Sequence, residues 1–441
     1  MKLRGLLVTT LVLCALIGAL YWSSHRKPSD EVSSKSADAP SILKLDEGGI
    51  TKLEIKKKGA DSIVLSRTSA NSWQIVEPEH LPADESSVSS VLSSISSLNS
   101  QRLVVDKATD LKSYGLDEPS LEADISEKDG KSQKLLIGDD TPTGGSVYAA
   151  LAGDPRVFTI ASYSKTSLDK SVNDLRDKRL VTITPDKISR LELTKNNESL
   201  EFGRNKEEWQ ILKPKPLRAD NFQVAELVRK VAGARMDFSG SSTEKETEAG
   251  FSHGTPVATV KVTDQSGTQE LQVRKDKDAY YAKSSVAEGS YKVDSDLGKS
   301  LDKGLDDFRN KKVFDFSYND PAKIEMHNGS KAYFLTRSGA DWWSNGKKED
   351  GESVEALVSK LRDLTADKFE DSGFSNPTIQ VIVTSDSGKR VENISIAKTG
   401  SGYLAKRENE PTLYALSGNS IEELLKAADD VKPAAAPPAK K

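Results

Sequence analysis

Hydrophobic and polar residues alternate in short stretches that recur three times along the chain. Leu53 and Ile55 are separated by charged residues, which is the pattern of a half-buried β-strand. The same alternation occurs at Leu191 and Leu193 and again at Ile324 and Met326. A turn and a second strand then lead to Trp73, Trp209 or Trp342, which lie 20, 18 and 18 residues after Leu53, Leu191 and Ile324. The agreement of these intervals predicts one β-hairpin built three times.

An amphipathic helix is predicted after each hairpin, because apolar residues return at intervals of three and four. These positions are Val88, Val91, Leu92, Ile95 and Leu98; Val224, Leu227, Val228 and Val231; and Val354, Leu357, Val358, Leu361 and Leu364. The serines within the first set are mediocre helix formers, so the prediction depends on the three instances together.

A second block follows each helix and also recurs. It opens on a glycine and an apolar residue, continues through a proline into an alternating strand, and turns at a glycine, Gly130, Gly267 or Gly388. A return strand, two short strands and a helix complete it. The first two copies end in cationic turns, Arg176-Asp177-Lys178 and Arg309-Asn310-Lys311, whereas the third ends at 421–428.

The pattern predicts an α+β chain with an N-terminal transmembrane helix and three tandem repeats, each of mostly antiparallel strands with two helices. The predicted parts are an N-terminal membrane anchor at 1–27, a flexible tether at 28–48, modules at 49–183, 184–317 and 318–430, and a disordered Pro/Ala/Lys tail at 431–441. The repeat is far longer than the roughly 20 to 50 residues of solenoid repeats, so each module is expected to bury its own core.

The anchor is predicted from Gly5–Trp22, 18 residues without a charge. A helix of this length spans about 27 Å, close to the thickness of the hydrocarbon core of a bilayer. We expect an uncleaved single-pass anchor in the inner membrane, with the N-terminus cytoplasmic and the body periplasmic or extracytoplasmic. A cleaved export signal is the alternative, although Tyr21 and Trp22 stand where small residues normally mark a cleavage site.

Composition narrows the function. The 63 Lys and Arg residues and 67 Asp and Glu residues give a net charge of -4, so no nucleic-acid partner is expected. Cys14, the single cysteine, lies in the apolar leader, and the four histidines are scattered far apart. No catalytic, cofactor-binding or metal-ligating residue is therefore predicted, and no cofactor. A hydrolase using scattered carboxylates stays an alternative, because such pairs leave no local sequence signature.

Two recurring features allow two interpretations each. The three tryptophans can close each sheet against its helix, or they can form an exposed stacking platform for a glycan or another polymer. The turns at Arg176-Asp177-Lys178 and Arg309-Asn310-Lys311 can complement a helix macrodipole, or they can bind an anion or a partner carboxylate.

The motifs of the first copy resemble a bacterial family of membrane-anchored proteins with a domain of unknown function, DUF4340. They are Trp73-Gln74-Ile75 with Pro78, Ala83-Asp84, Tyr114-Gly115-Leu116-Asp117-Glu118-Pro119, Leu136-Ile137-Gly138-Asp139, Val147-Tyr148 and Leu175-Arg176-Asp177-Lys178. Copy two shares Trp209, Pro214, Ala219-Asp220 and Arg309, whereas copy three lacks both the proline after Trp342 and the Arg-x-Lys turn. The resemblance implies a single-pass protein often encoded beside gliding-type ABC transporter subunits and their auxiliary extracytoplasmic protein.

These observations lead us to expect a non-enzymatic interaction or scaffold protein that is an accessory of an ABC-type transporter or envelope-assembly complex. The expected partners are the inner membrane, through residues 5–22, and the transporter subunits or the auxiliary protein. A cell-wall glycan or polymer binding protein and a carboxylate-based hydrolase are the alternatives.

Overall fold

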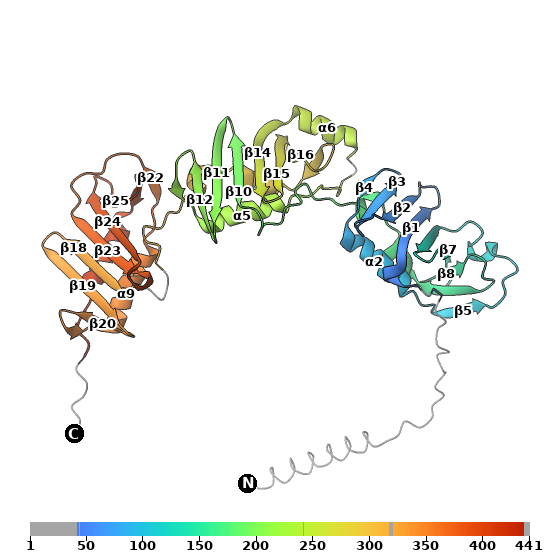
Figure 1. The fold of residues 1–441 in the computed structure, drawn as a ribbon, viewed down its shortest axis with the longest axis horizontal. Coiled ribbons are helices and arrows are strands. Elements are labelled where there is room, and N and C mark those ends of the chain that lie inside the picture. The colour runs from blue at the N-terminus through green and yellow to red at the C-terminus, as the bar shows by residue number, and fades with distance from the viewer. Residues whose placement is uncertain (1–41, 44, 241, 317–320, 436–441) are drawn as a thin grey trace, which may run out of the picture. The chain divides into compact units, whose positions relative to one another are not determined.

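The computed structural model describes residues 42–43, 45–240, 242–316 and 321–435 (Figure 1). The predicted anchor and most of the predicted tether lie outside these residues. Within the described ranges, no helix is long and apolar enough to cross a membrane. The chain divides into two compact units, one ending at Lys178 and one beginning at Arg179.

The first unit contains one antiparallel sheet of nine strands in the order β4-β3-β2-β1-β6-β7-β8-β9-β5. Its strands are β1 Ile50–Lys57, β2 Ile63–Arg67, β3 Trp73–Glu77, β4 Leu81–Pro82, β5 Arg102–Val105, β6 Leu121–Glu127, β7 Ser132–Asp140, β8 Ser146–Leu151 and β9 Val157–Ala161. Its helices are α2 Glu85–Ser96, α3 Ser162–Leu168 and α4 Val172–Leu175, with 3-10 turns η1 Glu47–Gly49 and η2 Lys112–Tyr114.

The second unit contains two antiparallel sheets. The eight-stranded sheet has the order β13-β12-β11-β10-β14-β15-β16-β17 and the nine-stranded sheet the order β21-β20-β19-β18-β23-β24-β25-β26-β22. The strands of the eight-stranded sheet are β10 Arg190–Lys195, β11 Glu198–Asn205, β12 Glu208–Lys213, β13 Leu217–Arg218, β14 Thr255–Asp264, β15 Gly267–Asp276, β16 Ala279–Ser284 and β17 Tyr291–Val293. Its helices are α5 Asn221–Ala232, α6 Glu244–His253, α7 Ser295–Leu301 and α8 Leu305–Phe308.

The nine-stranded sheet of the second unit is the third sheet of the chain. Its strands are β18 Lys323–Asn328, β19 Lys331–Ser338, β20 Asp341–Ser344, β21 Lys347–Lys348, β22 Lys368–Glu370, β23 Ile379–Ser385, β24 Arg390–Lys398, β25 Tyr403–Arg407 and β26 Leu413–Leu416. Its helices are α9 Gly351–Asp363 and α10 Gly418–Asp429, with a 3-10 turn η3 at Asp386–Gly388.

The three sheets share the order of their first eight strands, and the second sheet has no counterpart of the ninth strand, β5 or β22. In each, the first hairpin joins the second block through one antiparallel pair, β1 with β6, β10 with β14, or β18 with β23. The predicted α+β fold of mostly antiparallel sheets with helices is confirmed.

The predicted helix after each hairpin is also confirmed, and each begins at a capping aspartate. The carboxylates of Asp84, Asp220 and Asp350 accept backbone N–H groups in the first turns of α2, α5 and α9. Such a cap satisfies donors that the helix itself leaves unpaired. The buried faces of α2 and α5 consist of apolar positions that the sequence pattern predicts, and α9 buries Arg362 in addition to its apolar positions. Leu98 and Leu364, also predicted, are buried just after the ends of α2 and α9.

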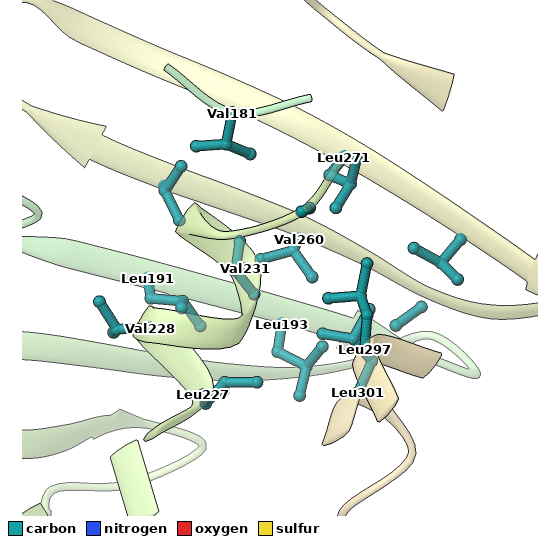
Figure 2. Packing of buried hydrophobic residues seen from close by; sticks show 14 of the residues in the cluster. Val181, Leu191, Leu193, Leu227, Val228, Val231, Val260, Leu271, Leu297 and Leu301 are labelled. Carbon is teal, nitrogen blue, oxygen red and sulfur yellow. The ribbon is translucent and has the colours of Figure 1, made fainter. Parts of the chain in front are cut away.

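Figure 2 shows how helix and sheet pack in the core of the eight-stranded sheet. Leu227, Val228 and Val231 of α5 pack with Leu191 and Leu193 of β10, and all are at most 3% exposed. Val181, which precedes the first strand of this sheet, packs in the same core and is 1% exposed. The segment that leads into the sheet is therefore part of its core.

The cores of the sheets do not follow the predicted module boundaries, because the segment before each first strand packs in the core of the sheet that follows it. Leu180, Val181 and Ile183, which the sequence assigns to the first module, lie in the core of the second sheet. Val313, Phe314 and Phe316 likewise lie in the core of the third sheet, and Ile42 and Leu43, assigned to the tether, lie in the core of the first. An apolar segment without periodicity gives no sign of which neighbouring sheet will bury it.

The helices differ from the predicted two per copy in number and length. The first sheet has α2 with two short helices, and the second sheet adds α6, which packs on β15, β16 and β17. Gly250 of α6 lies against the Tyr281 ring, and Phe251 lies under the cations of Arg274 and Lys283. The sequence pattern missed α6 because only Thr247, Gly250 and Phe251 of its ten residues are buried.

Candidate interaction site in the second unit

The three repeated tryptophans belong to the cores. Trp73, Trp209 and Trp342 are 5%, 6% and 6% exposed. The backbone N–H of Trp73 donates to the Glu85 carboxylate at 2.7 Å, and that of Trp209 donates to the Asn221 side chain at 2.5 Å. Each of these two residues thus ties its hairpin to the first turn of the following helix. Indoles this deeply buried offer no stacking platform to a glycan.

The cationic closing turns run beside the edge strand of their own sheet. Backbone bonds join Asp84 to Leu175 and Asp177 to Pro82 in the first sheet, at 2.7 and 2.8 Å. Asp220 with Phe308 and Asn310 with Arg218 form the same pair of bonds in the second sheet. The third sheet has the same two backbone hydrogen bonds, from Asp350 to Lys432 at 2.8 Å and from Ala434 to Lys348 at 2.9 Å. Lys432–Ala434, which the sequence assigns to the tail, therefore closes the third sheet.

Arg309 of the second closing turn extends to the third sheet. Its guanidinium carbon lies 3.5 Å from the centre of the Phe369 ring on β22, and its Nη2 donates to Thr412 Oγ1 at 3.1 Å. Asp306 pairs with its Nη1 at 3.0 Å, and the side chain is only 11% exposed. A cation on an aromatic face is worth about 2 kcal/mol when it is shielded from water. The turn therefore binds a neighbouring segment of the same chain.

Arg218, on edge strand β13 of the second sheet, makes a second connection to the third. Its Nη2 donates to the Tyr414 hydroxyl at 2.8 Å, and its Nε lies 2.9 Å from the Glu410 carboxylate. Asp315 pairs with its Nη1, and the Lys312 carbonyl accepts from Nη2. The side chain is 19% exposed. One guanidinium thus links β13 to β26 and to the segment between the two sheets.

A second arginine supports this arrangement from within the third sheet. Arg407 pairs with Glu392 at 2.9 Å and with Glu410 at 2.7 Å, and it also donates to the Val313 carbonyl. Glu392 is 4% exposed and accepts the backbone N–H of Asp315 at 3.0 Å. We call the set Arg218, Arg309, Asp315, Phe369, Glu392, Arg407, Glu410 and Tyr414 the arginine joint. Its carboxylates alternate with its cations, which is how buried charges are tolerated.

The pKa shifts at the arginine joint follow from this packing. Burial alone would lower the pKa of the Arg218 guanidinium, but Asp315 and Glu410 outweigh it and the pKa is raised. Burial raises the pKa of Tyr414 to about 12, with Glu410 acting in the same direction and Arg218 opposing it. Arg218 is therefore a permanent cation and Tyr414 a neutral hydrogen-bonding hydroxyl at physiological pH.

Two clefts of the second sheet are open and lined by both polar and apolar side chains. One of about 530 Å³ is lined by Arg229, Lys230, Gly233, Ala234, Arg235, Met236, Asp237, Ser239, Asp294 and Leu297. Another, of about 560 Å³, shares Asp237 and Asp294 with it. Hydrogen bonds from Ser239 lower the pKa of Asp237, and Asp294 caps α7. These two carboxylates already serve the fold, and no group of three metal-ligating side chains occurs in the described part of the chain.

A family model for a domain of unknown function, DUF4340, matches residues 73–210 and 209–378. The chain belongs to the DUF4340 family. The predicted resemblance is thus confirmed. Both matches begin at a tryptophan that closes a first hairpin, Trp73 or Trp209, so the matched unit runs from one sheet into the next. No curated protein and no solved structure matches the chain.

Sequence reasoning located only part of the arginine joint. The pattern of the Arg309 turn predicts either a complement to a helix macrodipole or a site for an anion or a partner carboxylate. On the third sheet Arg309 contacts an aromatic ring and a hydroxyl, and the carboxylate that it pairs with, Asp306, belongs to its own helix α8. Sequence reasoning missed Arg218, because the matching position on β4 in the first copy is Pro82. A residue that differs between copies carries no periodic signal.

Proposed function

We propose that this DUF4340 protein is a non-enzymatic scaffold anchored in the inner membrane through residues 5–22, with three tandem modules on the extracytoplasmic side. In this role it is an accessory of an ABC-type transporter or envelope-assembly complex. The anchor follows from the leader sequence, and the link to a transporter follows from the family resemblance alone.

The observation that carries the proposal is the arginine joint. Its buried polar groups converge on the contact between two sheets, and two arginines from the second sheet are fixed by named partners on the third. Removing one member of such a buried pair costs about 3 to 5 kcal/mol, so the joint holds the two sheets at a set spacing. Fixed spacing between binding surfaces is what a scaffold requires.

The carboxylates supply an argument against the hydrolase alternative. A general acid at neutral pH needs a raised pKa, because it must hold its proton until the reaction. In the described residues, every Asp or Glu with a resolved shift has its pKa lowered, as in Asp154 beside Arg156 and Glu201 beside Lys213. These carboxylates are acceptors in salt bridges and caps.

The test is affinity purification of the full chain from gently solubilised membranes, followed by identification of the proteins recovered with it. We expect ABC transporter subunits or their auxiliary extracytoplasmic protein to copurify. Arg309→Ala should reduce their recovery while the chain stays in the membrane fraction. The control Arg190→Ala, which removes a half-exposed cation on β10, should leave recovery unchanged.

Failure to recover any transporter or envelope-assembly subunit with the unmodified chain would overturn the proposed partner. A reporter fused after Lys441 tests the orientation separately. Activity of that reporter on the cytoplasmic side would overturn the extracytoplasmic placement of the modules.

A further inference from the structure

The third sheet has an aromatic strip on the face opposite its core. Along β18, β19 and β20, the residues facing the core are Ile324, Met326, Leu335 and Trp342, all buried. Strand alternation places His327, Phe334 and Trp343 on the other face. Phe334 is 42% exposed and Trp343 is 39% exposed.

The three aromatic residues are neighbours across the strands. Trp343 lies opposite Thr336, and Phe334 is two residues from Thr336 on the same face of β19. The rings of Phe334 and His327 are in edge-to-face contact with centroids 5.5 Å apart. Figure 1 shows β20, β19 and β18 side by side in that order. With strands about 4.8 Å apart, the strip extends across about 10 Å.

The strip is specific to the third sheet. The positions of Phe334 and Trp343 are occupied by Val64 and Gln74 in the first sheet and by Glu201 and Gln210 in the second. Val64 and Glu201 are 3% and 4% exposed.

Strand length accounts for this difference in exposure. Strands β3 and β12 continue past a bulge to place Glu77 beside Val64 and Lys213 beside Glu201. The third copy lacks this continuation, because β20 ends at Ser344 and the chain turns through Asn345 and Gly346. The shorter strand leaves Phe334 uncovered.

The surroundings of the strip favour a neutral ligand that accepts and donates hydrogen bonds. The charges on the strands of the strip are paired, since Lys323 pairs with Glu325 and Lys348 pairs with Asp341 at 3.0 Å. Gln380 lies opposite His327 and donates to Asn393 at 3.0 Å, and Asn393 donates in turn to the Glu408 carboxylate at 3.2 Å. Each amide keeps a further N–H and a free lone pair for a hydroxyl group.

The strip by itself is small for a contact with a second copy of this chain. A stable protein dimer buries about 800 Å² on each partner, far more than three half-exposed rings provide. A flat aromatic surface beside amide side chains fits the faces and hydroxyls of pyranose rings.

We propose that the strip of His327, Phe334 and Trp343 binds a neutral carbohydrate chain. Sugar ring faces stack on Trp343 and Phe334, and hydroxyl groups bind the amides of Gln380 and Asn393. This site is distinct from the buried tryptophans and from the arginine joint, and it does not depend on the transporter link. It gives the third module a ligand that the other two modules lack.

The test measures binding of chitotetraose and cellotetraose, two neutral oligosaccharides, to the full solubilised chain by titration calorimetry and tryptophan fluorescence. Trp343→Gln gives the third sheet the residue of the other two sheets at this position, and it should fold because Trp343 lies on the surface. We expect saturable binding of at least one oligosaccharide and a loss of about tenfold or more in affinity in this variant, which corresponds to about 1.4 kcal/mol.

Leu212→Ala is the matched control, since Leu212 is 40% exposed on the corresponding face of the second sheet. It should bind as the unmodified chain does. No saturable binding of either oligosaccharide up to about 10 mM would overturn the proposal. An affinity for the oligosaccharide that is the same in the unmodified chain and in Trp343→Gln would also overturn it. So would a protein that copurifies with the unmodified chain and not with Trp343→Gln, if neither chain binds sugar.

Discussion

The substitution Arg218→Met tests the arginine joint most directly, because it keeps the hydrophobic stem and removes the cation. Asp315 and Glu410 would then lie near each other without their shared partner, and Tyr414 would lose a donor. Breaking a buried pair costs about 3 to 5 kcal/mol. Arg218, Asp315 and Glu410 keep 19%, 24% and 20% of their side chains exposed, so we expect about 3 kcal/mol, the lower end of that range.

Native-state hydrogen exchange is the suitable assay, since a chain with several cores does not unfold in one step. The reporting amides are those of Asn310, Val313 and Ala366, which bond to Arg218, Leu364 and Lys311. A loss of about 3 kcal/mol corresponds to exchange about a hundredfold faster at these amides. Trypsin cleavage after Lys311 should accelerate in parallel.

Arg190→Met is the control for Arg218→Met, because the same substitution is made in the same sheet. Arg190 is half-exposed, and its partner Glu201 keeps Lys213 at 2.9 Å. This variant should lose no more than about 1 kcal/mol. If exchange at the three reporting amides rises less than tenfold in Arg218→Met, or equally in both variants, the joint does not hold the two sheets together and the reasoning fails.

Three further perturbations test other parts of the fold. Tyr414, whose pKa is raised to about 12, stabilises the fold below about pH 10, and this contribution of about 2 to 3 kcal/mol is lost as the pH rises to about 12. Tyr414→Phe should therefore flatten the fall of the urea midpoint between pH 9 and pH 12, and an equally steep fall would contradict this. Gly138→Ala would place a Cβ 2.1 Å from the backbone carbonyl of Tyr114, so circular dichroism should show a melting temperature at least several degrees lower, and an unchanged value would contradict the packing. Truncation after Asp430 removes the closing segment of the third sheet and should speed hydrogen exchange at the Asp350 amide, which donates to Lys432, whereas truncation after Ala435 should not; equal rates in the two would refute that role.

Much of the fold could be predicted because the same pattern occurs three times. The helix α2 is rich in serine, and it would be a weak prediction without α5 and α9, whose apolar positions repeat its period. The hairpin glycines Gly130 and Gly388 have φ of 81° and 91°, a conformation that other residues adopt only with strain. These requirements are local, and local requirements are visible in a sequence.

What the sequence did not reveal depends on contacts between distant segments. Phe369 and Thr412 lie far along the chain from Arg309, and nothing near them in sequence marks them as its partners. The aromatic strip escaped prediction for another reason. Trp343 is adjacent to Trp342, and which of two neighbouring indoles faces the core depends on the register with β19.

In the first sheet, the cation that pairs with the corresponding carboxylate comes from the same sheet. Asp154-Pro155-Arg156-Val157-Phe158 aligns with Glu410-Pro411-Thr412-Leu413-Tyr414 of the third sheet, where Arg218 of the second sheet supplies the cation. In the first sheet Arg156 supplies it instead, with three side-chain hydrogen bonds to Asp154 at 3.0, 3.1 and 2.6 Å and its guanidinium 5.2 Å from the Phe158 ring centre.

The closing segment of the third sheet, Lys432-Pro433-Ala434, contains no arginine. In the first sheet an internal arginine thus takes the place that Arg218 of the preceding sheet has in the third. In both sheets a carboxylate and an aromatic ring at this position have a guanidinium beside them, which is how a partly buried charge is tolerated, whichever sheet supplies the arginine.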